Sequence, residues 1–528
     1  MKSLQRLACI TLLIALPCAA QTHQKPTPAA ATWWAYTTAL ANDSMQGRDT
    51  GTAAYQRAAD YVAHQFAAFG LQPAGEPLTN PAKPTYFQSV PMHQVALLTE
   101  KSSVELLPDS NPTQSTPIQF LQQITLVPRD GLPALTTAPL VFLGYGLPDS
   151  ITDLHGKIAV FFSNSPASLA PADRLSFAAR RMAALSKSGA IALLAIDNPA
   201  AIETFHWPAA YARTVTLAST PAPPPNAPIL LRISAQAAPL LFSACGHSFA
   251  DILTLGTTGQ PLATFSMQAA LHLHLTTETK DISSPNILAI LPGSDPSLAP
   301  QYVALSAHLD GYGFGTPVLG DSLYNGALDD AAYVSTLLEL AQTQAALPLK
   351  SRPRRSLLFC IFTGEEKGLL GSAYFTAHPT VPAKNIVADL NLDQLRPIFP
   401  LHILTMEGLD DSTLGSTVRT LASTFHIEVR PDLEPERQLY RRADNYNFVR
   451  IGVPIASFIF GYNPGSPEEV VYRDWYNRRY HKPQDDLDTP IVWDAAVTFN
   501  RFYSALATAI ANNPTRPAWL TSSPNAPK

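Results

Sequence analysis

The chain has 528 residues, which is more than one ordinary hydrophobic core accommodates, so its length predicts two domains. Hydrophobic residues make up 46% of the chain and charged residues 15%, as in a globular protein, and the formal net charge is −5 at pH 7. A net negative charge argues against a nucleic-acid partner and against an anionic membrane surface as a partner.

The first twenty residues have the pattern of a secretory signal. Lys2 and Arg6 precede an apolar stretch at 7–16, and small residues follow up to a predicted cleavage site after Ala20. A membrane anchor is the competing interpretation, but this stretch is shorter than the ~20 residues that a spanning helix needs. We therefore expect residues 1–20 to be a signal peptide. The mature protein would then be periplasmic or secreted, without stable membrane association.

Two cysteines, Cys245 and Cys360, remain once the signal is removed. An oxidising compartment would permit a disulfide between them. Cys360 lies inside the apolar run SLLFCIF, however, and we place the two cysteines in different domains. Their spacing does not fit a zinc–cysteine site. We predict two free, buried thiols.

The amino-terminal part of the mature chain is predicted to be helical. Apolar residues recur at helical intervals from Tyr55 to Phe69, and Gly70 is a natural end for such a helix. The segment MQGRDTGT at 45–52 contains a glycine and is predicted to form a turn before the helix. We assign residues 30–94 to the main domain of the protein.

Residues 95–272 differ in character from the segments on either side. They contain short β-like runs, such as PLVFLGYG and GKIAVFF, and one helical stretch at 172–189. His, Asp and Glu do not cluster there at the spacing of metal ligands. We expect this segment to be a β-rich accessory domain inserted into the main domain.

From residue 273 to residue 512, apolar runs of strand length alternate with helical stretches. Because these runs are apolar almost throughout, the strands are expected to be buried on both faces, as in a parallel or mixed sheet. We therefore predict an α/β domain with a mixed, largely parallel central sheet flanked by helices. Residues 513–528 have no pattern and are predicted to be a flexible tail.

Side chains that bind metals follow the ends of the predicted strands. They are His308, Asp310, Asp329, Glu365, Glu366, Asp393 and, further along, His481. In open α/β sheets, functional sites gather at the carboxyl ends of the strands, so these residues are expected to converge on one crevice. Each acid taken alone is explained equally well as a helix-terminal or loop residue. Chance alone is a poor explanation for a metal-binding residue type after every one of these predicted strands.

The residue types restrict the choice of metal. Imidazoles and carboxylates without thiolates favour zinc, with manganese or cobalt as substitutes. Two histidines and three carboxylates exceed the usual three protein ligands of one catalytic zinc, and they suit two ions if one carboxylate bridges them.

Glu365 and Glu366 stand side by side after Gly364, whose freedom lets the backbone turn sharply. Neighbouring residues of an extended chain point to opposite sides. One glutamate is therefore expected to bind metal while the other faces the substrate. A carboxylate in that position can take a proton from water and later give it to a leaving amine.

Together these motifs resemble those of the co-catalytic di-zinc aminopeptidases, the family that contains aminopeptidase Y and the secreted bacterial leucyl aminopeptidases. AHLDGYG, DSLYNGALDDAA, TGEEKGLLGS, NLDQL and YHKPQDDLD follow the family's order. The segment 95–272 resembles, more loosely, the protease-associated domain that is often inserted in this family. The resemblance implies a zinc exopeptidase-like fold in which 30–94 and 273–512 form the peptidase domain.

The resemblance also implies two zinc ions per chain and a ligand set for each. Asp329 would bridge the ions, His308 and Asp393 would complete one site, and Glu366 and His481 would complete the other.

The same resemblance implies roles in catalysis. Glu365 would be the general base and acid, and Asp310 would orient His308 through its other ring nitrogen. Tyr480 would hydrogen-bond the tetrahedral oxyanion. The implied activity is removal of N-terminal residues from peptide substrates, by attack of a water that the two ions hold.

Two stretches depart from the family pattern. At 443–448, ADNYNF resembles a pocket motif that usually reads Ser-Asp-His, but Ala443 and Asn445 differ, so no substrate pocket is carried over. Asp330 stands where asparagine is commoner, and it would add negative charge beside the bridging Asp329.

Three other functions remain open at this point. A zinc carboxypeptidase acting on acidic C-terminal residues would need a cationic pocket, and the arginines of 437–442 and 474–480 could supply one. A glutaminyl-cyclase-like acyltransferase would use one zinc, and the inserted domain and the motif GEEKGLLGS argue against it. A non-catalytic relative would lack some ligands, whereas all five are present here.

Overall fold

The computed structural model describes residues 25–526, except 77–84, 112, 199–206 and 394–395. The predicted signal at 1–20 lies outside the described residues, so export stays a prediction. Among the helices that are described, none combines the length and the apolar character needed to cross a bilayer.

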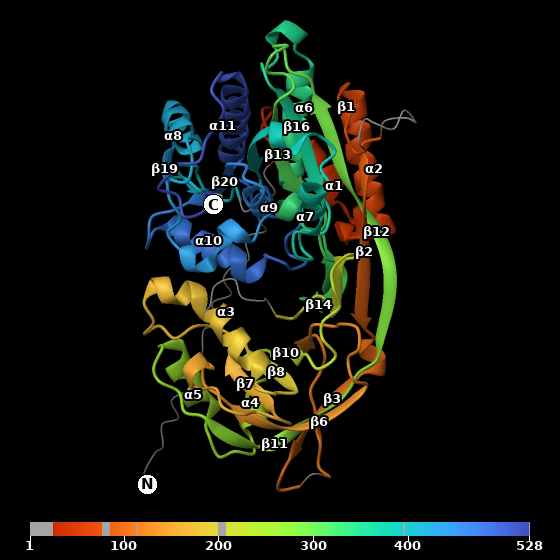
Figure 1. The fold of residues 1–528 in the computed structure, drawn as a ribbon, viewed down its shortest axis with the longest axis vertical. Helices are drawn as coiled ribbons and strands as arrows, with labels where there is room; N and C mark the ends of the chain where they lie inside the picture. Colours follow the sequence, from red (N-terminus) through yellow and green to blue (C-terminus); the bar gives the residue numbers. More distant parts are fainter. Residues whose placement is uncertain (1–24, 77–84, 112, 199–206, 394–395, 527–528) are drawn as a thin grey trace, which may run out of the picture.

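Two β-sheets form the framework of the described chain (Figure 1). Ten strands make up the first sheet, in the order β19-β18-β20-β17-β13-β16-β12-β2-β9, with β1 beside β12. Their bounds are β1 (Gln72–Pro73), β2 (Phe87–Leu97), β9 (Arg213–Leu217), β12 (Thr277–Leu291), β13 (Tyr302–His308), β16 (Ser356–Phe362), β17 (Ile386–Asn391), β18 (Ile403–Glu407), β19 (Glu428–Arg430) and β20 (Ile455–Gly461).

Parallel pairing in this sheet is concentrated at its centre. Strands β16, β13, β17 and β20 lie parallel to one another, and β18 pairs in parallel with β19. The other pairs are antiparallel, including those that β12 makes with β16 and β2. The central strands are buried along their whole length, as their continuous apolar sequences predict. The predicted mixed α/β fold is confirmed.

Helices cover both faces of the first sheet. Helices α1 (Ala31–Ala41), α2 (Ala53–Ala68), α6 (Ala332–Ala345), α8 (Leu414–Thr424) and α11 (Trp493–Asn512) share one hydrophobic core with it. On the other face, α7 (Leu370–Ala377) and α9 (Asn445–Arg450) pack against a second core. Helix α10 (Pro467–Arg478) lies toward the second sheet (Figure 1). Helix α2 ends just before Gly70, which has φ +77°, as the sequence predicts.

The second sheet has its own hydrophobic core and lies below the first in Figure 1. Its order in the described chain is β4-β3-β11-β6-β7-β8-β10-β5. The bounds are β3 (Ser103–Pro108), β4 (Thr116–Pro117), β5 (Ile124–Leu126), β6 (Leu135–Phe142), β7 (Ile158–Phe162), β8 (Ala192–Ile196), β10 (Ile229–Ile233) and β11 (Phe265–His274). Three helices accompany it: α3 (Pro171–Lys187), α4 (Pro239–Phe242) and α5 (Phe249–Thr257).

One strand of the range 95–272 does not belong to the second sheet. Strand β9 pairs antiparallel with β2 and forms the edge of the first sheet. The chain therefore crosses from the second sheet to the first and back again. A small hairpin, β14 (Gly313–Val318) with β15 (Asp321–Tyr324), contacts the segment before β9, where Thr316 N donates to Ala210 O at 2.8 Å. The boundaries of the inserted domain stay a prediction.

The segment after α11 corrects the expectation of a flexible tail. Trp519 Nε1 donates a hydrogen bond of 2.8 Å to Gly452 O, and Asn525 Nδ2 donates one of 3.0 Å to Asp411 Oδ2. The segment has no helical or strand periodicity in its sequence, and these side-chain contacts fix its position. The sequence pattern therefore does not reveal that the segment is ordered.

Cys245 and Cys360 are free and buried, and they lie in the separate cores of the second and the first sheet. The prediction of two free, buried thiols is confirmed.

We expect Trp519→Ala to lower the free energy of unfolding by about 1–3 kcal/mol, because it removes a partly buried ring and leaves Gly452 O without its donor. Urea unfolding followed by circular dichroism measures the change. Leu520→Ala is the control, because this neighbouring side chain is exposed. Equal urea midpoints for the two variants would contradict a stabilising role for the contacts of Trp519.

Candidate metal centre

The predicted metal ligands meet at one edge of the first sheet. His308 ends β13, the glutamate pair follows β16, and Asp393 follows β17. These three strands are adjacent and parallel, so their carboxyl ends lie at the same edge. Asp329 reaches this edge from the irregular turn Ala327–Ala331 before α6. His481 comes from the turn after α10.

Asp329 belongs to two groups of ligand atoms. His308, Asp329 and Asp393 form one group, and Asp329, Glu366 and His481 form the other, with all ligand atoms of a group within 4.8 Å of one another. Asp329 Oδ1 lies 3.2 Å from His308 Nε2, and Asp329 Oδ2 lies 3.4 Å from His481 Nε2. The two oxygens of one carboxylate thus face two different imidazoles.

The spacing of these atoms suits zinc. In a tetrahedral zinc site with bonds of about 2.0–2.2 Å, two ligand atoms lie about 3.3–3.6 Å apart. His481 Nε2 lies 3.3 Å from Glu366 Oε2, and the two distances to Asp329 are close to the same range. Within the described chain, His308 Nε2 and Asp329 Oδ2 are buried without an aligned hydrogen bond. Both atoms are therefore available to a metal.

The charges at the centre also favour bound cations. Burial raises the pKa of Glu365 well above its usual value, and Asp393 and Glu366 add to the rise. Burial likewise raises the pKa of Glu366 and of Asp393. Burial alone would lower the pKa of His308, but the surrounding acids, led by Asp330, raise it well above its usual value. So many acids in a buried site require positive charge nearby.

Glu365 stands beside the ligand groups without belonging to either. Its Oε2 lies 3.9 Å from His308 Nε2, and its side chain is 10% exposed. The sequence analysis predicted an extended backbone at the two glutamates, but the backbone turns there. Gly364 has φ +66°, and Glu365 O accepts hydrogen bonds from Gly368 N and Leu369 N in a tight turn. The turn, and not strand alternation, separates the two glutamates.

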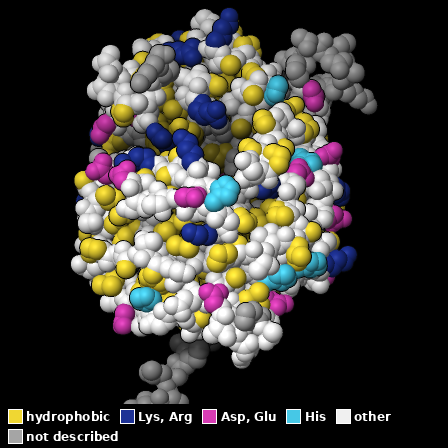
Figure 2. All heavy atoms as spheres, turned by 60° about the horizontal axis from the view of Figure 1, so that its bottom comes forward, with side chains coloured by type: hydrophobic (Ala, Val, Ile, Leu, Met, Phe, Trp, Pro, Cys, Tyr) yellow, Lys and Arg dark blue, Asp and Glu magenta, His cyan; other side chains and the backbone are white. Residues whose placement is uncertain are grey.

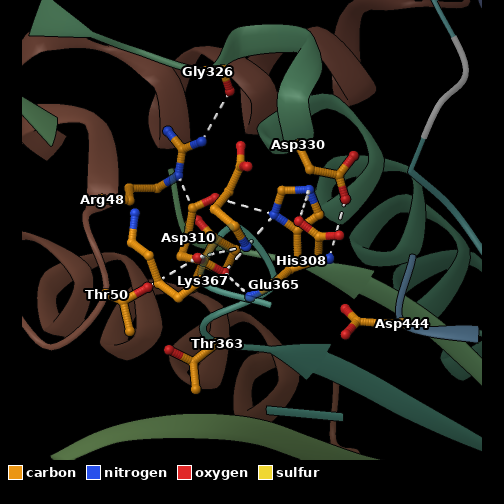
Figure 3. Close-up of polar contacts among 12 residues, drawn as sticks. Arg48, Thr50, His308, Asp310, Gly326, Asp330, Thr363, Glu365, Lys367 and Asp444 are labelled. Carbon is orange, nitrogen blue, oxygen red and sulfur yellow. Dashed lines mark hydrogen bonds and ion pairs between the residues drawn. The ribbon is translucent and has the colours of Figure 1, made fainter. Parts of the chain in front are cut away.

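Asp310 connects the loops that follow β13 and β16 (Figure 3). Its carboxylate accepts hydrogen bonds from Glu365 N at 3.0 Å, Glu366 N at 3.3 Å and Thr50 Oγ1 at 2.9 Å. His308 Nδ1 lies 3.1 Å from the main-chain carbonyl of Asp310 and 3.9 Å from its carboxylate. The contact with the other ring nitrogen of His308 is thus made by the backbone. It puts a proton on Nδ1 and leaves the Nε2 lone pair for a metal.

Tyr312 contacts two members of the second ligand group, Glu366 and His481, and the sequence analysis did not predict this contact. Its hydroxyl donates to Glu366 Oε2 at 2.8 Å and lies 3.1 Å from His481 Nδ1. Because the hydroxyl has one proton to donate, Nδ1 of His481 must donate to it, and Nε2 keeps its lone pair toward Asp329. Tyr312 lies in the motif AHLDGYG, but nothing in the sequence connects it to His481.

Asp485 and Arg48, which the sequence analysis also missed, hold the backbone around Asp329. The Asp485 carboxylate accepts from Leu328 N at 3.1 Å and Asp329 N at 3.0 Å. Arg48, which is fully buried, donates to the carbonyls of Leu309, Asn325 and Gly326 (Figure 3). Their partners are main-chain atoms, which leave no trace in the side-chain pattern.

Tyr480 and Asp330 lie next to the ligands. The ring of Tyr480 stacks on that of His481 with 3.6 Å between centroids, and burial raises the pKa of the tyrosine well above its usual value. Its predicted contact with an oxyanion stays a prediction. Asp330 is fully buried, and its Oδ2 accepts from His308 N at 3.1 Å.

A buried cation connects the centre to the segment around β9. Lys367 Nζ lies 3.2 Å from Asp49 Oδ1 and above the rings of Tyr211 and Tyr312, 4.9 and 4.6 Å from their centroids. Tyr211 Oη donates to Asp49 Oδ1 at 3.0 Å, and Arg213 pairs with the same carboxylate.

The arginines proposed for a carboxylate pocket are dispersed. Arg437 pairs with Glu434, Arg478 with Asp474 and Arg479 with Asp488, and Arg441 lies over the ring of Tyr446. Arg442 instead lines a cavity that also contains Glu366.

Several curated proteins are similar to part of the chain. The match to probable leucine aminopeptidase 2 of Aspergillus fumigatus is 26% identical over 205 residues, 38% of this chain and 37% of that protein. The match to aminopeptidase YwaD of Bacillus subtilis is 26% identical over 194 residues, 36% of this chain and 37% of that protein. The chain thus matches little more than a third of the length of these relatives.

Solved structures with the same fold cover nearly the whole chain. An aminopeptidase from Aneurinibacillus sp. strain AM-1 has a TM-score of 0.57 and 19% identity, over 92% of this chain and 95% of its own. BSAP, a zinc aminopeptidase from Bacillus subtilis, has a TM-score of 0.55 and 18% identity, over 95% and 98%. At these identities the likeness concerns the fold.

The family model that matches this chain covers the strands and loops that carry all five predicted metal ligands. It is that of peptidase family M28, and it matches residues 286–507. This agrees with the resemblance inferred from the motifs. Over these residues, the chain's α/β domain is similar to peptidase family M28.

Proposed function

We propose that this protein is a metallo-aminopeptidase that holds two zinc ions and removes N-terminal residues from peptides. The observation that carries the proposal is the sharing of Asp329 between two ligand groups, each completed by one histidine and one further acid. The named activities of the similar aminopeptidases, and the zinc of BSAP, support it.

The side chains around the centre suit hydrolysis. Zinc ions, when bound, lower the pKa of water and polarise a carbonyl group. Glu365 lies within reach of the same space without being a ligand, so it is the group to accept a proton and pass it to the leaving amine. Asp310 fixes the Glu365 backbone for this task.

The alternatives are less well supported. A cyclase with one zinc would not need two ligand groups that share an acid. A non-catalytic relative would not need Glu365 beside a complete ligand set. Of the arginines proposed for the cationic pocket of a carboxypeptidase, Arg437, Arg478 and Arg479 pair with acids, and Arg441 lies over the ring of Tyr446.

We expect the purified protein to contain close to two equivalents of zinc and to hydrolyse leucyl-anilide. A chelator should abolish the activity, and added zinc should restore it. Metal analysis and absorbance of the released aniline measure the two quantities. Cleavage confined to N-terminally blocked peptides would favour the carboxypeptidase, and cyclisation of N-terminal glutamine would favour the cyclase.

Glu365→Gln is expected to retain both zinc ions and to lose about 10²–10⁴-fold in kcat, because the amide cannot accept a proton. Glu366→Gln is the matched variant, and it should lose zinc as well, because this carboxylate belongs to a ligand group. Zinc content and kcat are measured on both. A Glu365→Gln enzyme with most of its wild-type rate would refute the assigned role.

Tyr312→Phe is expected to weaken zinc binding about 10–100-fold, since the contacts that orient Glu366 and His481 are lost. Competition with a chromogenic chelator measures the affinity. Tyr324→Phe is the control, because this buried tyrosine donates to Thr316 O and touches no ligand. Equal zinc affinities for the two variants would exclude the orienting role of Tyr312.

A further inference from the structure

Strand β9 has an open edge. It is the last strand of the first sheet, and within the described residues its only strand partner is β2. At the two ends of this pairing, Leu97 N donates to Ala212 O at 2.9 Å and Ala218 N donates to Pro91 O at 3.0 Å. Hydrogen-bonded pairs alternate in an antiparallel ladder, so the main-chain groups of the odd-numbered residues of β9 point away from β2. Such an edge is a template for another strand.

Val215 is the central residue of this edge. Its side chain is buried in a core with residues of β2 and α7, yet the residue lines a cavity of about 680 Å³. The main chain of Val215 is therefore the part that borders the cavity. Leu217 O already accepts from Thr220 N at 2.8 Å. In the described chain, the open edge thus extends from Arg213 to the N–H group of Leu217.

The cavity beside β9 begins at the metal centre. Glu366, a member of the second ligand group, lines it, and so does Tyr211, which lies two residues before β9. The ring centroid of Tyr211 is 6.1 Å from that of Tyr312, whose hydroxyl donates to Glu366. Tyr211 and Arg213 both contact the carboxylate of Asp49. The first residue of β9 is therefore held next to the centre.

A second cavity, of about 580 Å³, continues the first along the strand. It also contains Thr216 and Ala218, which lie further from the start of β9. The lining residues that the two cavities share are Val127, Pro128, Met182, Thr214 and Leu230. Together the two cavities form the β9 groove, which starts at the metal centre and follows the strand. Figure 2, in which the end of the molecule with the second sheet comes forward, shows a hollow in the surface with Lys and Arg side chains beside it.

The other wall of the β9 groove comes from the second sheet and is apolar. Val127 follows β5, Leu230 belongs to β10, and Val127 N donates to Leu230 O at 3.0 Å. These two side chains are 46% and 36% exposed, and both residues line both cavities. Exposed apolar side chains that gather in a groove mark a binding surface.

An open strand edge beside an apolar wall suits an extended peptide. The main chain of the peptide can pair with the edge, while alternate side chains contact the wall. A peptide that has its first residue at the metal centre and leaves along the groove runs in the same direction as β9, from Arg213 toward Leu217. Because β9 has five residues, the pairing extends over about five residues of the peptide.

We propose that the β9 groove binds the part of a peptide substrate that follows the scissile bond, as a parallel strand added to the open edge of β9. The inference rests on the proposed aminopeptidase function and specifies its substrate class. This class is extended peptides of about six residues or more, in preference to dipeptides. The second sheet then supplies the apolar wall of the substrate site.

Two substrates with the same scissile bond test the dependence on length. One is leucyl-threoninamide, and the other is the hexapeptide amide that continues this sequence with alternating valine and threonine. We expect the wild-type zinc enzyme to have a kcat/KM about tenfold or more higher for the hexapeptide, because several main-chain hydrogen bonds together have this strength. Chromatography of the released leucine measures both rates. A ratio near one would overturn the inference.

Methylation of a main-chain nitrogen tests for strand pairing. Successive N–H groups of a strand point to opposite edges. Of two hexapeptides, one methylated at the nitrogen of the third residue and one at that of the fourth, only one should therefore lose the gain in kcat/KM. Each peptide is the control for the other, since both carry one methyl group. Equal values of kcat/KM for the two peptides would overturn the pairing with β9.

Leu230→Asp tests the apolar wall. The ratio of kcat/KM for the hexapeptide to that for the dipeptide should fall to about one, because an apolar side chain packed on a carboxylate removes it from water. Leu135→Asp is the matched control, since this leucine is exposed on β6 of the same sheet and lines neither cavity. It should keep the wild-type ratio. Zinc content and melting temperature show that both variants are folded. Equal ratios for the two variants would overturn the role of the wall.

The alternative occupant of the β9 groove is a second copy of the chain. Sedimentation velocity would then show a wild-type dimer that Leu230→Asp dissociates, together with a wild-type ratio near one, and this result would overturn the inference. Failure of the proposed function is seen separately, as the absence of leucyl-anilide hydrolysis by the wild-type zinc enzyme.

Discussion

The arrangement of the metal centre depends on one carboxylate. Asp329 presents each of its two oxygens to a different imidazole, within a site where several other acids are buried. Acids this close repel one another, and burial strengthens the repulsion, so the arrangement needs both a rigid frame and compensating positive charge. Asp485 and Arg48 supply the frame through main-chain hydrogen bonds. Metal ions are the natural source of the charge.

The sheet explains how distant parts of the sequence reach this carboxylate. Adjacent parallel strands deliver His308, the two glutamates and Asp393 to the same edge, and short turns set their final directions. The supporting residues come from outside these strands. Thr50, near the amino terminus, and Asp485, near the carboxyl terminus, contact the loops from opposite ends of the chain. The candidate metal site therefore draws on residues from both ends of the described chain.

Much of this architecture could be predicted from the sequence. Apolar runs predicted the central strands, and the acids and histidines after them predicted the side chains that meet at the candidate site, because residue type and position both carry the signal. Tyr312, Asp485 and Arg48 could not be found in this way, since each acts on atoms distant in sequence and often on the main chain. The ordered structure around Trp519 was not predicted for a similar reason, because its contact is with a residue distant in sequence. The pairing of β9 with the first sheet was not predicted, because a short apolar run does not reveal which sheet it joins.

The position of β9 makes the accessory segment inseparable from its host. Between its strands in the second sheet, the chain contributes the edge strand β9 to the first sheet. Arg213, which begins this strand, and Tyr211, which precedes it, share Asp49 with Lys367. Excising the insertion at its sequence boundaries would expose the long strand β2 and leave Lys367 buried with fewer partners. The two sheets therefore depend on each other through β9 and are not joined as a host with a detachable module.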